Sequence, residues 1–336
     1  MRATLAFLLV LAASSANACT TFCAHGLFGR NYDFEVGHGH VLVNKRGMEK
    51  ESATPKPAQW VSKYGSVTFN QFGRDNATGG MNEKGLVVEL MWLDGTRYPA
   101  ADARPELGTL EWIQYQLDTA ASVAEVLESA KKVRIAERGV PLHYLIADAA
   151  GDVATVEFLD GKLVVHRGDS LPVPALANDA YAWSVKNDSA RFARTANGLK
   201  RATTVDAAFA LLDEVAQPHT QWSIVYDLRN RAVHWRTKDN REKRSLRFDG
   251  LAFGCAAPTR VLDVHEGGGD VANLFRDYST AANLALLRAS VRGTSFLRNT
   301  PDAEIEKDAK FPERSRCTAA TAPVARQTPS ATTRRR

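Results

Sequence analysis

The chain has 336 residues, of which 44% are hydrophobic and 24% are charged, and its formal net charge at pH 7 is +5. These are ordinary values for a globular protein, so they exclude an intrinsically disordered chain, and the length suffices for one large domain or two small ones. Basic and acidic residues are interleaved except in the all-arginine residues 334–336, so the composition gives no sign of nucleic-acid binding.

The N-terminus has the parts of a secretory signal peptide. A basic Arg2 precedes an apolar run over residues 5–13, and Ala16-Asn17-Ala18 gives the small-x-small pattern that a signal peptidase cleaves. We therefore predict a signal peptide over residues 1–18 and an exported, periplasmic or secreted protein whose mature chain begins at Cys19. No other apolar run is long enough to span a membrane, so we expect no membrane span.

Cleavage after Ala18 would leave a thiol and a free α-amino group on the same residue, Cys19. An α-amino group titrates near about 8 and a thiol near about 8.5, so the amine can serve as the base that activates the thiol. Two other interpretations remain open here: a structural cysteine, or the lipid-bearing cysteine of a lipoprotein. Ala16 and Asn17 argue against the lipoprotein, whose signal normally has a larger aliphatic residue followed by a small one.

The central elements follow from periodicity and capping signals. The first strands are predicted over residues 20–28, 41–44, 60–72 and 86–93. Leu110, Ile113 and Leu117 share one face of a helix that follows Thr109. A capping box of Ser122 and Glu125 then predicts a second helix, ending near residues 131–132.

The later elements follow the same order of strands and then helices. Strands are predicted over residues 142–148, 153–158 and 163–166, helices over residues 189–200 and 205–215, and a hairpin over residues 222–227 and 232–236. Thr203 and Asp206 are expected to cap the second of these helices. Helical stretches continue to about residue 288, and residues 318–336 have the composition of a disordered tail. This order predicts an α+β protein.

Four cysteines in an exported chain limit the possible disulfides. If Cys19 is a free thiol, at most one pair forms among the other three, and Cys255 with Cys317 is the more plausible pair. Cys23 lies four residues after Cys19, so both face one side of an extended strand, and we expect Cys23 to be a small buried side chain.

His38 and His40 suggest a metal site, but no third ligand stands near them at a suitable spacing. They are more simply interpreted as solvent-exposed loop histidines. We therefore expect no metal and no cofactor.

Five short motifs stand in order behind Cys19. They are residues 28–35 (Phe-Gly-Arg-Asn-Tyr-Asp-Phe-Glu), 80–86 (Gly-Met-Asn-Glu-Lys-Gly-Leu), 142–148 (Leu-His-Tyr-Leu-Ile-Ala-Asp), 176–178 (Leu-Ala-Asn) and 189–192 (Ser-Ala-Arg-Phe). Together they resemble the choloylglycine hydrolase family, which contains conjugated bile salt hydrolases and penicillin V acylases. The resemblance extends from residue 19 to about residue 255.

The resemblance implies a fold, a reaction and a set of roles. The fold would be a four-layer αββα sandwich of the N-terminal nucleophile hydrolase type, over residues 19–317, and the reaction hydrolysis of a linear, non-peptide amide bond in a small N-acyl compound. Cys19 would be the nucleophile, Asp33 would orient its amino group, and Arg30 would favour the thiolate. Asn178 would donate to the oxyanion, and Arg191 would complete the charge network.

Aromatic residues distinguish this chain from the bile salt hydrolases. Trp92 stands where the family has Asn or Tyr, although it is also compatible with a purely structural role in the core. With Phe34, Tyr32 and Trp60, it predicts a pocket for an aromatic or long aliphatic acyl group. Penicillin V and long-chain N-acyl homoserine lactones are therefore expected to be better substrates than bile salts.

Only 12 residues separate Asn178 from Arg191. Bile salt hydrolases have a much longer segment there, which packs their subunits into a tetramer. An oligomer is possible for this chain, but we do not expect that loop-built tetramer. An exported or lipid-anchored binding protein that keeps the fold without catalysis remains an alternative function.

Overall fold

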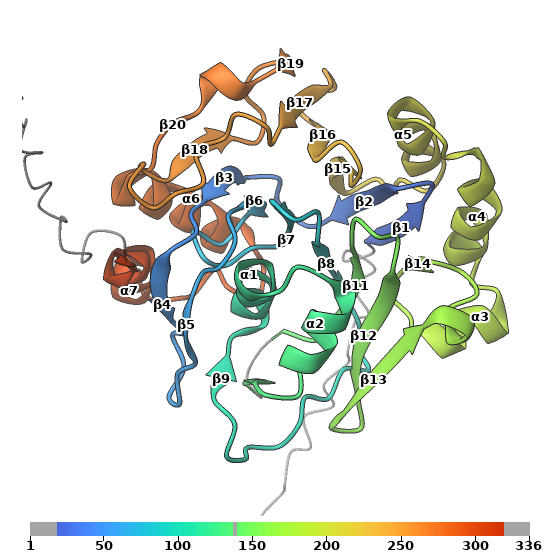
Figure 1. Cartoon of the computed structure of the whole chain (residues 1–336), viewed down its shortest axis with the longest axis horizontal. Coiled ribbons are helices and arrows are strands. Elements are labelled where there is room, and N and C mark those ends of the chain that lie inside the picture. The colour runs from blue at the N-terminus through green and yellow to red at the C-terminus, as the bar shows by residue number, and fades with distance from the viewer. Residues whose placement is uncertain (1–18, 137–139, 319–336) are drawn as a thin grey trace, which may run out of the picture.

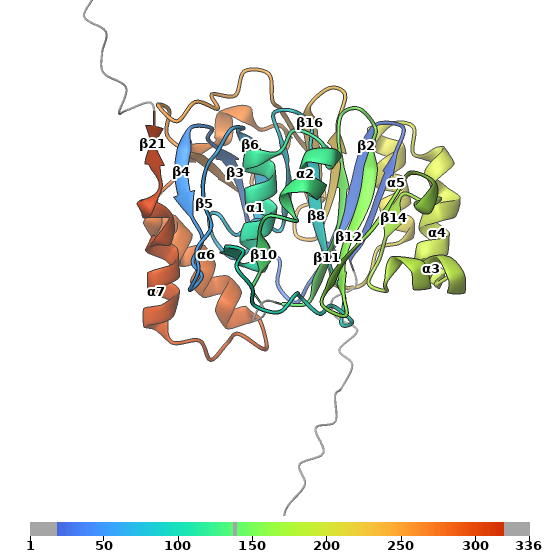
Figure 2. The same ribbon diagram turned by 60° about the horizontal axis from the view of Figure 1, so that its bottom comes forward.

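The computed structural model describes residues 19–136 and 140–318. Within these residues, two large β-sheets lie face to face between two layers of helices (Figure 1). Figure 2 shows α1 and α2 on one side and α3, α4 and α5 on the other. The predicted α+β class and four-layer αββα sandwich are therefore confirmed.

The first sheet has seven strands in the described part of the chain. In spatial order they are β14 (Ala175–Leu176), β1 (Thr20–Ala24), β2 (Leu27–Asp33), β15 (Thr220–Asp227), β16 (Ala232–Thr237), β17 (Arg244–Arg247) and β19 (Gly269–Asp270). All neighbours are antiparallel except β17 and β19. The order places β1 and β2 beside β14 and β15, which come from the middle of the chain.

The second sheet has nine strands among the described residues, and all of its pairs are antiparallel. In spatial order they are β13 (Lys162–Arg167), β12 (Val153–Leu159), β11 (Leu142–Ala147), β8 (Val87–Trp92), β7 (Gly79–Asn82), β6 (Ser66–Asn70), β3 (His40–Asn44), β18 (Arg260–Asp263) and β20 (Arg276–Asp277). Two minor sheets pair β9 (Glu106–Leu107) with β10 (Arg134–Ile135), and β4 (Met48–Glu51) with β5 (Gln59–Val61) and β21 (Arg316–Cys317).

The main core lies between the two sheets and is rich in aromatic side chains. Phe28, Phe69, Trp222, Tyr226 and Trp235 are fully buried there. The rings of Phe69 and Trp235 meet edge to face at 5.6 Å, an arrangement that adds about 1 kcal/mol to the free energy of area burial. The sheets are thus held at a fixed separation, which is what positions polar groups between them.

Seven α-helices are described. They are α1 (Thr109–Thr119), α2 (Val123–Ser129), α3 (Tyr181–Asn187), α4 (Ala190–Gly198), α5 (Val205–Glu214), α6 (Thr280–Gly293) and α7 (Asp302–Lys310). Helix α1 begins where the Glu111 side chain accepts from the Gly108 backbone N–H at 2.7 Å. Its buried residues Trp112, Ile113 and Leu117 form a second core beneath the nine-stranded sheet.

Several predicted boundaries were wrong. Residues 20–28 do not form one strand, because the chain turns at His25 and Gly26. Helix α2 ends at Ser129, and α5 is capped by Thr204, whose Oγ1 accepts from the Ala207 N–H, and not by Thr203. Helix α3 was not predicted.

Cys255 and Cys317 form a disulfide that joins residues 62 positions apart, with a Cα–Cα distance of 5.4 Å. The disulfide fastens β21 near β4, and Thr318 N–H donates to the Gly47 carbonyl oxygen at 2.8 Å. The preferred pairing is confirmed, and Cys19 and Cys23 are buried free thiols.

The described helices include none that is both long and apolar enough to cross a membrane. The predicted signal peptide, residues 1–18, lies outside the described residues. The predicted disordered tail also lies outside them, apart from its first residue, Thr318.

Candidate active site

Cys19 directly precedes β1, at the open end of the β1–β2 hairpin. The hairpin turns at His25 and Gly26, whose φ angles are 55° and 81°, and two successive positive φ angles suit the twist of paired strands. The returning strand brings Asp33 beside Cys19. The Cys19 thiol is buried, and its Sγ donates to the backbone carbonyl oxygen of Asp33 over 3.7 Å.

Arg30 points from β2 into the space between the sheets and is fully buried. Its Nη1 donates to the Thr78 carbonyl oxygen at 2.9 Å and forms an ion pair with the buried carboxylate of Glu89 on β8. Its Cζ lies 4.7 Å from the centre of the Tyr32 ring. Among the described residues, no group hydrogen-bonds to its Nε or Nη2, so these donors are available to an anion formed nearby.

Opposing influences act on the Cys19 thiol. Burial raises its pKa and is the largest influence, whereas the positive charge of Arg30 is the largest that lowers it. The net direction is upward, so the buried thiol is protonated at neutral pH and needs a base before it can act as a nucleophile. Arg30 does lower the pKa of the Cys19 thiol, as expected, but the effect of burial is larger and the pKa is raised overall.

Asp33 ends β2 with a fully buried carboxyl group. Burial raises the pKa of this carboxyl to about 6, although a hydrogen bond from Thr220 and the charge of Arg191 both lower it. The Thr220 hydroxyl donates to Oδ1, and Arg191 Nη1 lies 3.8 Å from Oδ2. Asp33 is therefore an anion only above about pH 6.

Arg191 connects Asp33 to Asn178. Its Nη2 donates to the Asn178 side-chain oxygen at 2.7 Å, and the Asn178 Nδ2 donates to the backbone carbonyl oxygen of Trp92 at 2.8 Å. The short segment between Asn178 and Arg191 folds as α3 and the start of α4. These two helices bring Arg191 back beside Asn178.

A buried histidine and glutamate hold the segment that carries Asn178. His143 on β11 contacts the Ala177 carbonyl oxygen through Nε2 at 2.8 Å and Glu157 through Nδ1 at 3.0 Å. Glu157 also accepts from the backbone N–H of Tyr181, the first residue of α3, at 3.0 Å. Residues 177–181 are thereby fixed to the nine-stranded sheet on both sides of Asn178.

A cavity of about 790 Å³ opens beside Cys19. Cys19, Tyr32, Asp33, Phe34 and Trp92 line it near the thiol. Arg30, Asn178 and Arg191 are not among the described lining residues, but each contacts one that is. Of the nine residues predicted for the site and its pocket, all but Trp60 therefore belong to one connected arrangement.

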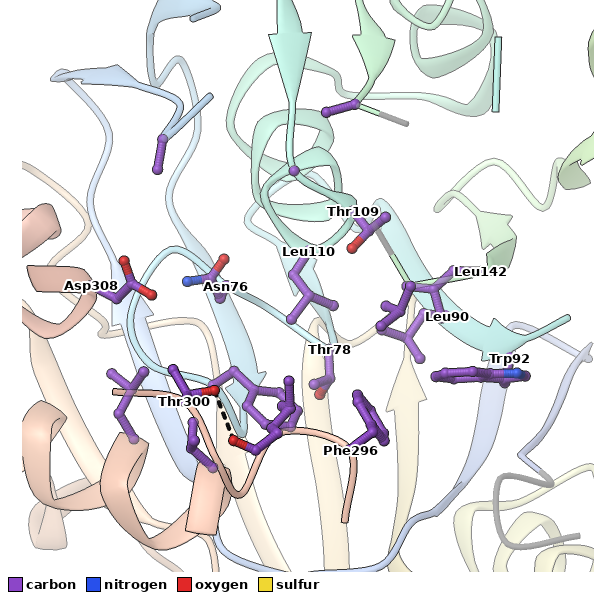
Figure 3. Close-up of a pocket in the computed structure, with 18 of the residues that line it drawn as sticks. Asn76, Thr78, Leu90, Trp92, Thr109, Leu110, Leu142, Phe296, Thr300 and Asp308 are labelled. Carbon is purple, nitrogen blue, oxygen red and sulfur yellow. Dashed lines mark hydrogen bonds between the residues drawn. The ribbon is translucent and has the colours of Figure 1, made fainter. Parts of the chain in front are cut away.

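The rest of the cavity is bounded by apolar side chains together with polar ones, among them Asn76, Thr109 and Asp308 (Figure 3). Leu90 and Leu142 come from the nine-stranded sheet, Leu110 from α1, and Leu287 and Val291 from α6. The volume lies within the range of pockets that bind small molecules. The size and lining of the cavity thus suit a small molecule with an apolar group beside the Cys19 thiol.

The predictions for Trp60 and His40 were wrong. Trp60 does not line the cavity in the described structure, because its ring packs against Tyr115 and its Nε1 donates to Asp118 at 2.8 Å. His40 is not in a loop, because it begins β3 and is half-buried, whereas His38 is exposed. The described residues contain no group of three or more His, Cys, Asp or Glu residues that could hold a metal ion.

Glu89 and Thr220 were not identified from the sequence. Glu89 pairs with Arg30 and accepts from the Tyr226 hydroxyl at 2.6 Å, and burial raises its pKa to about 7. A sequence signal existed, because Glu89 is the only charged residue in the otherwise apolar residues 86–92. Thr220 gave no such signal, because a threonine at a strand end is common.

Comparisons with known proteins place this arrangement in a class. The chain is similar to the solved structure of penicillin V acylase from Agrobacterium tumefaciens, with a TM-score of 0.68 and 25% identity over 78% of this chain and 98% of that one. A mutant of conjugated bile acid hydrolase from Clostridium perfringens shares the fold, with a TM-score of 0.62 and 17% identity over 75% of this chain and 98% of that one. The fold is that of the N-terminal nucleophile hydrolases.

The sequence places the chain within that class. Residues 18–208 match the model of the linear amide C–N hydrolases, choloylglycine hydrolase family, and the chain belongs to that family. A penicillin V acylase from Pectobacterium atrosepticum is 36% identical over 131 residues. That match covers 34% of this chain and 35% of the relative, so it spans about a third of the relative's length.

Proposed function

We propose that this protein is an exported amidase that hydrolyses the linear amide bond of an N-acyl compound with Cys19 as its nucleophile. The observation that carries the proposal is the position of the buried Cys19 thiol. It lines a largely apolar cavity and lies where the charge of Arg30 acts on it. Family membership supports the bond type, and the penicillin V acylases among its relatives support an acyl compound as substrate.

The reaction begins with removal of residues 1–18, which frees the α-amino group of Cys19. A peptide-bonded nitrogen has no lone pair available to act as a base, whereas a free amine does. The thiol transfers its proton to this amine, and the sulfur attacks the carbonyl carbon of the substrate. The carbon–nitrogen bond then breaks, the leaving amine takes the proton, and water hydrolyses the thioester.

The neighbouring residues stabilise the charges that form. Arg30 has unpartnered buried donors to offer the thiolate, and Asp33 orients the α-amino group and raises its basicity as an anion. Asn178 donates to the oxyanion. Arg191 is the positioning residue that holds Asp33 and Asn178 in one network.

The acyl group occupies the apolar part of the cavity. Burial of apolar area contributes roughly 25 cal/mol per Å², so a phenoxyacetyl or long aliphatic group gains far more from this cavity than an acetyl group. Tyr32, Phe34 and Trp92 provide flat surfaces at the thiol end. We therefore expect penicillin V and long-chain N-acyl homoserine lactones to be better substrates than conjugated bile salts.

The test uses the mature protein and four amides. Intact mass and N-terminal sequencing establish whether the chain begins at Cys19, and kcat/KM is measured for penicillin V, a decanoyl homoserine lactone, glycocholate and an N-acetyl control. We expect the first two to exceed the N-acetyl amide by orders of magnitude, and Cys19→Ala to abolish turnover. Glycocholate as the best substrate by tenfold would refute the acyl preference.

The second candidate function is a binding protein that keeps the fold without chemistry. The largely apolar cavity is the observation that favours it, because such a cavity can hold a small molecule whether or not Cys19 reacts with it. A diacylglyceryl mass on the N-terminus would identify a lipid-anchored form. Absence of turnover for all four amides by a protein that begins at a free Cys19 would favour this alternative.

A further inference from the structure

The segment between α6 and α7, residues 294–301, forms part of the cavity wall. Phe296, Leu297 and Thr300 line the cavity from this segment, which lies well beyond the family-matched residues 18–208. Figure 3 shows Phe296 beside Trp92, close to Leu90 and Leu142. We call residues 294–301 the α6–α7 loop.

The α6–α7 loop is hydrogen-bonded to the segment that follows β2, the strand that carries Arg30 and Asp33. The backbone N–H and the hydroxyl of Ser295 donate to the two carboxylate oxygens of Glu35 at 2.8 and 2.7 Å. Glu35 lies two residues after Asp33. The bidentate contact therefore fixes the loop to the chain directly after β2.

The loop also has internal support. Arg292, in the last turn of α6, donates to the carbonyl oxygens of Arg298 and Thr300 at 2.7 Å each and forms an ion pair with Asp302. The Thr300 hydroxyl donates to the Leu297 carbonyl oxygen at 2.7 Å. The backbone that carries Phe296 is thus held in one conformation at both ends.

Phe296 is an exposed aromatic ring held over the cavity. Half of its surface, 50%, is exposed, and its ring centre lies 6.0 Å from that of Trp92 at an interplanar angle of 61°. Trp92 is itself oriented by a hydrogen bond from its Nε1 to Asp94 at 2.6 Å. The fold does not need a half-exposed ring for its core, whereas a ligand in the cavity could cover its free face.

We propose that Phe296 is a specificity-determining residue, which forms with Trp92 an aromatic pair that holds flat aromatic or straight-chain acyl groups, and that Glu35 positions it. This inference rests on the proposed function, because it names the acyl class of the same site. A flat or extended group can lie against both rings. A rigid, bulky ring system would have to displace Phe296 from its place against Trp92.

The first experiment compares Phe296→Ala with Trp183→Ala, which removes another ring that is 50% exposed but does not line the cavity in the described structure. We expect Phe296→Ala to lower kcat/KM for penicillin V by about tenfold or more, mainly through KM, and to change the N-acetyl control by less than twofold. Trp183→Ala should change neither substrate by more than twofold. Equal losses on both substrates, or no loss on penicillin V, would overturn the assignment of Phe296.

The second experiment tests Glu35 by a double-mutant cycle. Glu35→Gln should weaken the two hydrogen bonds from Ser295. It should lower kcat/KM for penicillin V, as Phe296→Ala does, but by a smaller factor. If Glu35 acts through Phe296, the double variant should be no worse than Phe296→Ala alone. Losses that add in full would overturn the positioning role.

Binding measurements separate this inference from the proposed function. In Cys19→Ala protein, calorimetry measures the Kd of penicillin V with no hydrolysis, and adding Phe296→Ala should raise that Kd about tenfold. If wild-type protein hydrolyses nothing and this rise is still observed, the proposed reaction fails and the role of Phe296 stands. If penicillin V does not bind, or binds equally to both proteins, the role of Phe296 fails.

Discussion

The two ends of the cavity are built by different parts of the chain and in different ways. At the thiol end, Cys19 and Asp33 belong to one hairpin, and both are buried and hydrogen-bonded. Away from the thiol, Leu110 from α1 and Leu287 from α6 line the cavity beside polar residues that include Asn76 and Asp308. The comparison teaches that a local hairpin places the reacting group, whereas long-range packing shapes the space for the substrate.

The two ends also differ in their expected effect on stability. Burying Arg30 with Glu89 and burying the Asp33 carboxyl costs desolvation free energy, which ion pairing offsets only in part. Burying Leu287 and Val291 stabilises the fold by about 1.5–3 kcal/mol each. Changes to Cys19 should therefore alter activity more than stability, whereas removing Arg30 or Glu89 alone would leave the charge of its partner buried and unpaired, which costs stability as well.

The largest effect is expected from the N-terminus itself. A mature protein that carries one extra residue before Cys19 should be nearly inactive, because its Cys19 nitrogen is an amide and not a base. Its melting temperature should stay within a few degrees of that of the protein beginning at Cys19, since every side chain of the core is kept. Full activity of the extended protein, checked by N-terminal sequencing after the assay, would refute the amine as the base.

Asn178→Ala should have the next largest effect. If Asn178 donates to the oxyanion, kcat should fall by about 10²–10³. The variant also loses the contacts of Asn178 with Trp92 and Arg191, so unfolding is measured in parallel. A loss of kcat of tenfold or less would reassign Asn178 to a structural turn.

Removal of the disulfide should affect stability and leave the chemistry unchanged. Cys255→Ser with Cys317→Ser opens a loop whose ends are 62 residues apart, and loop entropy predicts a loss of about 4 kcal/mol in the free energy of unfolding. Denaturant unfolding measures the loss. The disulfide lies at β21 beside β4, in a different sheet from β1 and across the molecule from it (Figure 1). We therefore expect kcat on penicillin V at low temperature to stay within twofold, and a large fall in kcat would contradict the separation of the two regions.

A pH dependence is expected from Asp33, whose pKa burial raises to about 6. Its unfolded value is about 3.9, so ionisation destabilises the folded uncleaved chain progressively between about pH 4 and 6, by roughly 2–3 kcal/mol above that window. The free energy of unfolding of Asp33→Asn should therefore rise relative to that of the wild type as pH increases through this window. Below the window, the substitution should give no such gain. An unfolding series from pH 3.5 to 7 measures the difference.

The activity of the mature protein should also depend on the ionisation of Asp33, but with the opposite sign. If the anion is required, kcat/KM of the mature protein falls as pH drops through the pKa of Asp33. A protonated α-amino group beside the carboxyl would lower that pKa, so the acid limb should lie at or below about pH 6. A limb clearly above pH 7 would assign the titration to another group.

The smallest effect concerns assembly. The short segment between Asn178 and Arg191 folds back as α3 in contact with its own chain, so we expect no tetramer built on it. Light scattering of the mature protein, together with a variant such as Trp183→Ala on the exposed face of α3, measures this. A tetramer that Trp183→Ala dissociates would contradict the prediction.

The sequence predicted the order of the elements well and their junctions less well. Alternation and apolar runs located β8, β11 and β12 to within a residue or two. The turn at His25 and Gly26 was missed because it interrupts a run that otherwise has the pattern of one strand. Helix α3 was missed because a helix of seven residues has too few periods to show an amphipathic pattern.

The site was predicted by residue type but not by contact. The motifs brought forward Arg30, Asp33, Asn178 and Arg191, and the structure connects all of them with Cys19. The sequence could not show that Arg30 pairs with Glu89, because the two residues lie on facing sheets. The sequence also could not exclude Trp60 from the pocket. The position of its ring depends on contacts with Tyr115 and Asp118 of α1, which lie more than 50 residues away in the chain.

The sequence by itself determined the class of fold, the preferred disulfide pair and the residues available for chemistry. These depend on local patterns, on short motifs and on the number of cysteines in the chain, none of which requires knowing how distant segments pack. Only the tertiary structure decided that Arg191 bridges Asp33 and Asn178, and that Phe296 lies against Trp92 across 204 positions of chain. Such contacts form where separately folded elements pack, and the geometry of packing is set by the whole core and not by any one segment.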